Sequence, residues 1–229
     1  MSPRLGLSSG SAPGLDAREL AALVRRAGGA VADLRAGKGH RWEKQGIEGL
    51  GGLPVSFVGI SVVLGEPDQD TGQAARFPGR SIKVFAAPGV GGAEPAAAQI
   101  AALARDRGTE QILVETHRGG AGPDELAALC ARHGCRLVLD NLGLAEITGD
   151  FAGALRKLAP WTAAVQVKGF DPAPGPGARP VHRPLAGRDL GWLRAFVAAP
   201  IDITVESRSG TPLRDLATLR DAWRAVECA

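Results

Sequence analysis

The chain has 229 residues, a length that suits one barrel or doubly wound domain as well as two small domains. Hydrophobic residues make up 45% and charged residues 22%, which is ordinary for a soluble globular protein and excludes extensive disorder. The formal net charge of +3 is small and spread along the chain, so neither nucleic acid nor a membrane surface is an expected partner. We expect a single domain over residues 1–229.

The three cysteines, Cys130, Cys135 and Cys228, cannot all pair within one chain. The sequence has neither a signal peptide nor an apolar run long enough to span a membrane. Cys130 and Cys135 could form half of a metal clip, but no second cysteine pair follows them. These features predict a cytoplasmic protein with structural thiols.

Strands and helices are predicted to alternate from the start of the chain. Asp16 and Glu19 have the spacing of a capping box, and the apolar residues after them recur at helical spacing. The segments 41–52 and 66–79 are short and glycine-rich, so any helices there are one or two turns long. Apolar strands are expected at 4–8, 30–35, 55–63 and 81–87.

The second half continues the alternation with longer helices. Pro95 at a first helical position begins a helix that ends near Gly108. The loop 171–180 is rich in proline and glycine and is expected to hold neither helix nor strand. Strands are expected from Ile112 and at 136–140, 162–168 and 201–206, with helices at 123–134, around 151–158, at 190–197 and from Pro212 onward.

Eight short strands, most of them followed by a helix, are typical of a parallel α/β fold. Eight is the number of strands that closes a barrel, and such barrels typically take about 250 residues. We therefore predict a compact (β/α)8 TIM barrel with trimmed helices after strands 2 and 3. A doubly wound sheet is the weaker alternative, because no G-x-G-x-x-G motif follows the first strand.

Polar side chains end the last four predicted strands: Glu115, Asp140, Gln166 and Glu206. The active sites of such barrels lie at these carboxyl ends. Three carboxylates packed together require a cation, and an amide carbonyl adds a fourth oxygen ligand. Oxygen ligands favour one divalent metal ion, Mg²⁺ or Mn²⁺, although the ligand type also admits Co²⁺ or Ni²⁺.

Further side chains are expected near this quartet. His117 shares a strand face with Glu115 and is a candidate base, or else a group that orients Glu115. Lys83 and Lys168 either neutralise the carboxylates or hold a substrate oxyanion. Candidate substrate-binding residues at the rim and at a lid are Asp33, Arg35, His40, His182 and Arg183.

Several of these segments resemble the xylose isomerase-like TIM barrel superfamily of sugar phosphate isomerases and epimerases, hydroxypyruvate isomerase-like proteins and dehydroshikimate dehydratase-like proteins. The resemblance covers nearly the whole chain. Its motifs are Leu5-Gly-Leu-Ser-Ser-Gly10, Glu115-Thr-His117, Asp140 after Val-Leu, Gln166-Val-Lys168, Arg183-Pro-Leu185 and Val205-Glu206.

The resemblance implies that Glu115, Asp140, Gln166 and Glu206 bind one divalent metal. Gln166 stands where many members carry His, and the hydroxypyruvate isomerase-like and dehydroshikimate dehydratase-like members also use Gln there. Many members place a His three residues after the strand-six Asp, but this chain has Gly143 at that position. The departure affects a hydrogen bond to substrate.

The implied activity is that of a metal-dependent isomerase or epimerase. It would act on a small sugar or hydroxy-keto compound by proton transfer next to a carbonyl, through an enediolate. Glu115 or Glu206 would be the base, with His117 the alternative, as in dehydratase-like members. The runner-up activity is accordingly a metal-dependent dehydratase or lyase.

Two other functions and one assembly state are also considered. A DNA-repair nuclease of the same superfamily is disfavoured, because those enzymes use several His ligands and this chain has four His in all and no basic patch. A degenerate barrel that binds a ligand without turnover is compatible with Gly143. A homodimer is an open expectation that the sequence does not decide.

Overall fold

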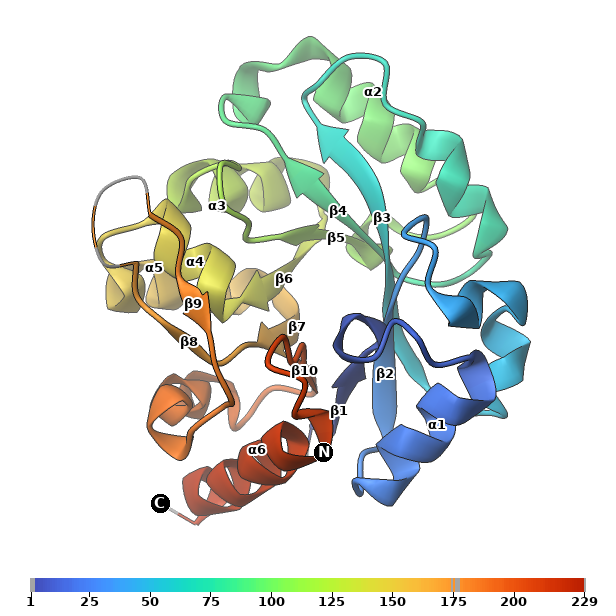
Figure 1. Cartoon of the computed structure of the whole chain (residues 1–229). Helices are drawn as coiled ribbons and strands as arrows, with labels where there is room; N and C mark the ends of the chain where they lie inside the picture. The colour runs from blue at the N-terminus through green and yellow to red at the C-terminus, as the bar shows by residue number, and fades with distance from the viewer. Residues whose placement is uncertain (1–2, 174, 176–177, 229) are drawn as a thin grey trace. The chain divides into compact units, whose positions relative to one another are not determined.

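The computed structural model describes residues 3–173, 175 and 178–228 (Figure 1). Eight strands form a closed barrel in the order β1-β10-β7-β6-β5-β4-β3-β2, which confirms the predicted fold. Their bounds are β1 Arg4–Ser8, β2 Val31–Arg35, β3 Val55–Leu64, β4 Ile82–Ala86, β5 Ile112–Glu115, β6 Arg136–Asp140, β7 Thr162–Val167 and β10 Asp202–Val205. The chain divides into two compact units, unit 1 (residues 1–55 and 166–229) and unit 2 (residues 56–165).

In unit 1, β1 lies between β10 and β2 and is parallel to both. A Cβ atom at Gly6 would lie 1.7 Å from the carbonyl oxygen of Val31, so only glycine allows β1 and β2 to approach this closely. Helix α1 (Ala17–Arg26) lies beside β2, and α6 (Pro212–Glu227) beside β1 (Figure 1). Each helix buries an apolar face, which includes Leu20 in α1 and Leu216 in α6.

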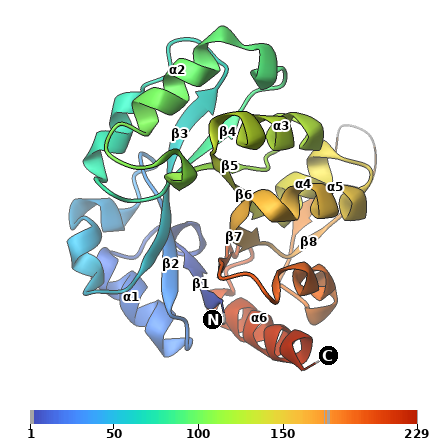
Figure 2. The ribbon, with the colours of Figure 1, turned by 180° about the vertical axis from the view of Figure 1, so that it is seen from behind.

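In unit 2, strands β3 to β6 pair in sequence order, all parallel. Phe57, Leu113, Val138 and Ala164 form a buried apolar cluster. The helices of this unit are α2 (Glu94–Leu103), α3 (Pro123–His133), α4 (Asn141–Ile147) and α5 (Phe151–Leu158). Helices α3 and α5 lie side by side, as Figures 1 and 2 both show.

Short 3-10 helices replace full helices after β2 and β3, as the glycine-rich segments predict. They are η2 (Arg41–Lys44) and η3 (Ile47–Leu50) after β2, and η4 (Thr71–Arg76) after β3. Gly51 follows η3 at φ 58°, in the left-handed region that glycine adopts without strain. These segments therefore connect strands without covering them with a long helix.

The structure differs from the predicted elements at four places. Strand β5 ends at Glu115, so His117 lies beyond the strand. Helix α4 begins directly after β6, where no helix was predicted, and residues 191–196 form the 3-10 helix η9 (Gly191–Phe196) and no α-helix. Asp171, expected in a loop, pairs with Val181 in the hairpin of β8 (Phe170–Asp171) and β9 (Val181–His182). Residues 174, 176 and 177 of that expected loop lie outside the described residues.

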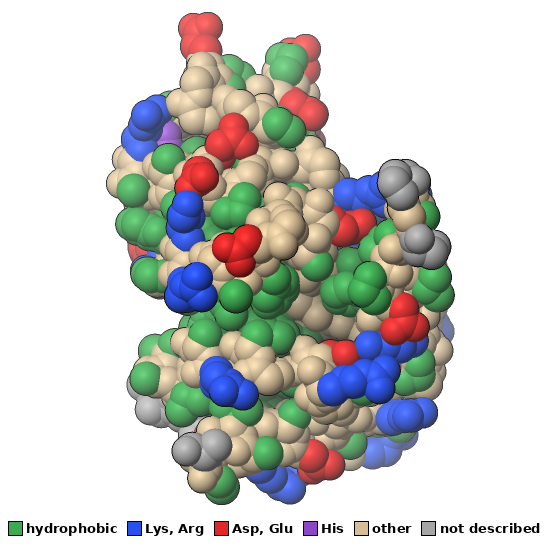
Figure 3. All heavy atoms as spheres, turned by 90° about the vertical axis from the view of Figure 1, so that its left-hand side faces the viewer, with side chains coloured by type: hydrophobic (Ala, Val, Ile, Leu, Met, Phe, Trp, Pro, Cys, Tyr) green, Lys and Arg blue, Asp and Glu red, His purple; other side chains and the backbone are tan. Residues whose placement is uncertain are grey.

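Among the described residues, no helix is both long and apolar enough to cross a membrane. Acidic and basic side chains are interspersed with apolar ones over the face drawn in Figure 3.

All three cysteines are free: Cys130 and Cys135 are buried with their sulfur atoms 3.8 Å apart, and Cys228 is exposed. The prediction of structural thiols fits the two buried residues.

The capping box of α1 gives a first prediction. The Asp16 carboxylate accepts a hydrogen bond from the Glu19 N–H at 3.0 Å, and the Glu19 carboxylate accepts one from the Asp16 N–H at 2.8 Å. We expect Asp16→Ala to lower the free energy of unfolding by about 1 kcal/mol, because the helix loses its cap. Urea denaturation measures this, with Asp221→Ala on the exposed side of α6 as the matched control. Equal stability of the two variants would contradict the role of the cap.

Candidate functional site

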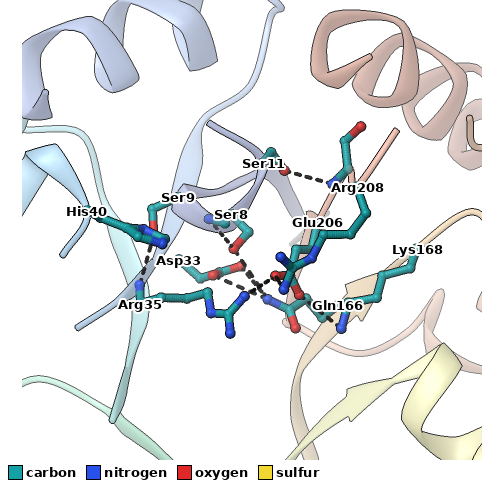
Figure 4. A network of polar contacts seen from close by, with 12 residues as sticks. Ser8, Ser9, Ser11, Asp33, Arg35, His40, Gln166, Lys168, Glu206 and Arg208 are labelled. Carbon is teal, nitrogen blue, oxygen red and sulfur yellow. Dashed lines mark hydrogen bonds and ion pairs between the residues drawn. The ribbon is translucent and has the colours of Figure 1, made fainter. Parts of the chain in front are cut away.

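The predicted site residues are distributed over both units. Unit 1 contains Asp33, Arg35, His40, Gln166, Lys168, His182, Arg183 and Glu206, and unit 2 contains Lys83, Glu115, His117 and Asp140. In unit 1 the structure brings six of the eight into one polar network (Figure 4). In unit 2 it brings Lys83, Glu115 and His117 together.

Glu206, directly after β10, forms ion pairs with three cations in unit 1. Its Oε1 lies 2.6 Å from Nη1 of Arg35 and 2.7 Å from Nη2 of Arg208, and its Oε2 lies 2.9 Å from Nζ of Lys168. Burial by itself would raise the pKa of Glu206, but the charges of Lys168, Arg35 and Arg208 outweigh it and lower the pKa to about 2. Glu206 is therefore an ionised, neutralised carboxylate.

Asp33 lies in β2 and is fully buried beside this group. Nε2 of Gln166 lies 3.2 Å and 3.3 Å from its two carboxylate oxygens, and Oγ1 of Thr204 donates to it at 2.5 Å. Burial raises the pKa of Asp33 to about 6, although hydrogen bonds from Ser8, Thr204 and Gln166 oppose the shift. Asp33 is part of the interior of the network, not of an exposed rim.

His40 and Arg35 are held by the segment that follows β1. Nδ1 of His40 lies 3.3 Å from Oγ of Ser9, which also accepts a hydrogen bond from the Arg35 N–H at 2.8 Å. Burial, together with the charge of Arg35, lowers the pKa of His40. The indole N–H of Trp42 donates to the carbonyl oxygen of Arg35 at 3.2 Å, so the backbone at Arg35 is fixed from two sides.

His182 and Arg183 lie at the β8–β9 hairpin. The His182 residue is exposed, in β9. The Arg183 guanidinium is paired with Asp189 through two hydrogen bonds of 2.7 Å and with Asp171 through a third of 2.7 Å. Arg183 therefore joins the hairpin to the segment before η9, and its pairing with two carboxylates raises its pKa.

Lys83, Glu115 and His117 form the second group, at the carboxyl end of β5 in unit 2. The Lys83 ammonium is ion-paired with Oε2 of Glu115 and lies 4.1 Å from the centre of the Phe85 ring. Nδ1 of His117 lies 3.8 Å from Oε1 of Glu115, and its ring packs against Phe85 with centroids 4.6 Å apart. Glu115 is 6% exposed whereas His117 is 52% exposed, so the imidazole is the member of the group that solvent reaches.

Asp140 caps the helix that follows it. Its Oδ1 accepts a hydrogen bond from the Gly143 N–H at 2.8 Å, and its backbone N–H and carbonyl oxygen both bond to Oγ1 of Thr116 at 2.9 Å. A Cβ atom at Gly143 would lie 1.9 Å from the carbonyl oxygen of Thr116. The first turn of α4 thus passes so close to the end of β5 that no side chain fits at position 143.

The donor atoms of the predicted quartet and the charges beside them decide whether a divalent metal fits. Carboxylate and amide oxygens are the right ligand type for Mg²⁺ or Mn²⁺. Both glutamates of the predicted quartet are, however, already neutralised, Glu115 by Lys83 and Glu206 by three cations. Within the described part of the chain, no group of three or more His, Cys, Asp and Glu side chains is arranged to hold a metal ion. The charges at Glu206 therefore do not fit a further cation.

Sequence reasoning missed Arg208, Thr204 as a hydrogen-bond donor, and Phe85. Arg208 follows β10 in a serine-rich loop, where no periodicity marks the direction of a side chain. Thr204 stands two residues before Glu206, so the alternation of a strand puts both on one face, a signal that could have identified it. Phe85 lies in β4, two residues after Lys83. Its contact with His117 depends on the path of the loop after β5, which the sequence does not reveal.

Neither a scan of protein-family models nor a search of curated proteins finds a match to this sequence. Solved structures with the same fold include 3-keto-D-glucoside 4-epimerase of E. coli, with 14% identity and a TM-score of 0.66 over 99% of this chain and 100% of that one. The probable 3-DHS dehydratase AsbF of Bacillus anthracis has 13% identity and a TM-score of 0.65 over 95% and 98% of the two chains. The IOLI protein, solved with a bound zinc atom, has 9% identity and a TM-score of 0.67 over 98% of each chain. These structures therefore share the closed eight-stranded barrel fold with this chain.

The close approach at Gly143 gives a second prediction. We expect Gly143→Ala to lower the free energy of unfolding by about 1–3 kcal/mol, because the added methyl group forces α4 away from Thr116. Gly149→Ala is the matched control, since a Cβ atom there meets nothing within 4 Å. Chemical denaturation of both variants measures the effect, and a neutral Gly143→Ala would show that α4 has room to move.

The ion pairs of Glu206 give a third prediction. The pKa of Glu206 in the folded protein, about 2, lies below its ordinary value of 4.5, so its ionisation stabilises the fold above about pH 4.5. This stabilisation is lost as the pH falls toward 2. Lys168→Gln removes one of the cations that lower the pKa, so its loss of stability relative to wild type should be largest above pH 5 and shrink below pH 4. Urea denaturation between pH 3 and pH 7 measures this, and a pH-independent difference would contradict it.

Proposed function

We propose that this chain, whose fold is that of the xylose isomerase-like barrels, is an enzyme that moves a proton on a carbon next to a carbonyl. Its activity would be that of an isomerase or epimerase of a small sugar or keto acid. The observation that carries the proposal is the group of Lys83, Glu115 and His117 at the end of β5. Structures with the same fold, among them 3-keto-D-glucoside 4-epimerase and D-psicose 3-epimerase, support this class of activity.

His117 is the base that we assign to this reaction. Glu115 lies on the Nδ1 side of the imidazole, so the carboxylate orients the ring and stabilises it when it takes up a proton. The ion pair with Lys83 fixes Glu115, and Phe85 supports the ring from the side. The exposed His117 is thus the member of the group that a substrate can reach.

The two glutamates are less suited to the role of base. A base works best when its pKa lies near the working pH, and the pKa of Glu206 is about 2. Glu115 is buried and paired with Lys83. This pairing makes Glu115 a weaker base than His117, and we keep it as the alternative. The three cations beside Glu206 argue against the prediction that Glu206 is the base.

The deprotonated carbon places negative charge on the neighbouring oxygen, which requires a positive group. Lys83 is a candidate for that positive group in unit 2.

Binding of a divalent metal, Mg²⁺ or Mn²⁺, remains a prediction from the sequence. The positive charges around Glu206 argue against it, so the experiment below is done with and without metal. Cytoplasmic location and a homodimer also remain predictions.

A dehydratase or lyase is the second candidate, and the exposed imidazole favours it. Abstraction of a proton next to a carbonyl by His117 is also the first step of water elimination when a hydroxyl group sits one carbon further along. The probable 3-DHS dehydratase shares the fold at 13% identity. Product analysis separates the two, since an epimerase conserves the mass of its substrate and a dehydratase releases water.

Proton exchange with deuterated water tests the proposal. We expect wild type to incorporate deuterium next to the carbonyl of at least one member of a panel of small ketoses and hydroxy-keto acids, assayed by NMR with EDTA and with added Mg²⁺ or Mn²⁺. His117→Gln should slow the exchange about 10²–10⁴-fold, the usual effect of losing a positioned base. His133→Gln, at the end of α3, is the matched control.

Two outcomes would contradict the proposal. Absence of exchange with every substrate, with and without metal, would leave a barrel that binds without turnover. Exchange that survives His117→Gln but is lost in Glu115→Gln would transfer the role of base to the carboxylate.

A further inference from the structure

Three cations surround the buried carboxylate of Glu206. Arg35, Lys168 and Arg208 all form ion pairs with Glu206, whose side chain is only 4% exposed. Asp33, the other carboxylate of the network, accepts its hydrogen bonds from the uncharged groups of Gln166, Thr204 and Ser8. The ion pairs of these three cations with Glu206 therefore concentrate positive charge at one point of unit 1.

The two arginines have donors to spare. Arg35 uses Nη1 for Glu206 and Arg208 uses Nη2, and within the described residues the remaining guanidinium N–H groups of both have no partner. Their side chains are 27% and 39% exposed, against 11% for Lys168, so the unused donors are within reach of solvent. In Figure 4 the two guanidinium groups both approach the Glu206 carboxylate.

The backbone is fixed at Arg35 and at the residue before Arg208. Arg35 ends β2, and its N–H and carbonyl oxygen bond to Ser9 and Trp42. The residue before Arg208 donates its N–H to Oγ of Ser11 at 2.7 Å, and the same hydroxyl donates to the carbonyl oxygen of Val205 at 3.0 Å. Because the pair is held in place before any ligand arrives, a ligand loses less binding energy to ordering it.

We propose that unit 1 carries a binding site for a small monocarboxylate, formed by the unused guanidinium donors of Arg35 and Arg208 beside Glu206, with Lys168 adding charge. The planar fork of an arginine matches a carboxylate through paired hydrogen bonds. A monocarboxylate brings a single negative charge next to the buried Glu206 carboxylate. A dianionic phosphate brings two negative charges there, so its repulsion from Glu206 is larger. The site stands on unit 1 alone and requires no reaction.

Equilibrium binding of three probes tests the site: glycolate, its neutral ester methyl glycolate, and inorganic phosphate. The side-chain Nε–H signals of the arginines are followed by NMR during titration of the whole chain. We expect saturable binding of glycolate with shifts in the signals of Arg35 and Arg208, no saturable binding of methyl glycolate, and weaker binding of phosphate.

Variants separate a built site from general attraction to positive charge. Arg208→Gln should weaken glycolate binding roughly 10- to 100-fold, the effect of losing one charge-assisted hydrogen bond. Arg208→Lys, which keeps the charge but loses the fork, should fall between Arg208→Gln and wild type. Arg224→Gln on the exposed surface of α6 removes the same charge elsewhere and should bind as wild type does. Arg35→Gln provides an independent second variant.

Three results would overturn the proposal: no saturable glycolate binding, equal binding by Arg208→Gln and Arg224→Gln, or tighter binding of phosphate than of glycolate. The measurement involves no turnover, so its failure is distinguishable from a failure of the proton-exchange assay. Conversely, glycolate binding by a chain that shows no proton exchange would establish the site and reject the enzyme.

Discussion

The burial of the Glu206 carboxylate is the constraint on which the polar interior of unit 1 depends. Removing an ionised carboxylate from water costs several kcal/mol unless opposite charges and hydrogen bonds replace the water. Here the replacement comes from the end of β2 through Arg35, from the residue after β7 through Lys168, and from the loop after β10 through Arg208. These segments are far apart in the sequence, so satisfying one carboxylate fixes three segments near the same point. Loss of any one cation leaves the others to neutralise the buried charge, which gives the arrangement some tolerance to substitution.

Unit 2 meets the same requirement with fewer groups. Glu115 is neutralised by Lys83 from the neighbouring strand β4, and His117 lies on the other side of the carboxylate. The difference between the two glutamates has chemical consequences. Glu206, with three cations, is a fixed anion that leaves guanidinium donors available, whereas Glu115 has an exposed imidazole beside it. The two proposed roles, anion binding for the first group and proton transfer for the second, rest on these surroundings and not on the identity of the acidic residue.

Most of the elements were predictable because the signals that specify them are local. The apolar runs that became β1, β3 and β6 differ from prediction by no more than one residue at either end, and the capping box at Asp16 places the start of α1. Helix α4 was missed because it begins directly at the end of β6 with Asp140 as its cap, so no loop separates strand and helix in the sequence. The segment 191–196 has the apolar content of a helix, but it forms 3-10 turns.

The sequence by itself determined that this chain is a barrel of eight strands and that acidic and basic residues gather at strand ends, since both depend on periodicity and on the positions of breaks. Only the tertiary structure decided what each charge faces. Asp33, predicted at a rim, is fully buried and bonded to neutral donors, and Arg208, in a loop without a pattern, lies on Glu206. The absence of a side chain at position 143 likewise has its reason in the carbonyl oxygen of Thr116, 27 residues earlier. The physical reason is that burial and charge pairing are set by distances in space between residues that are remote in the chain, and a single sequence carries no record of those distances.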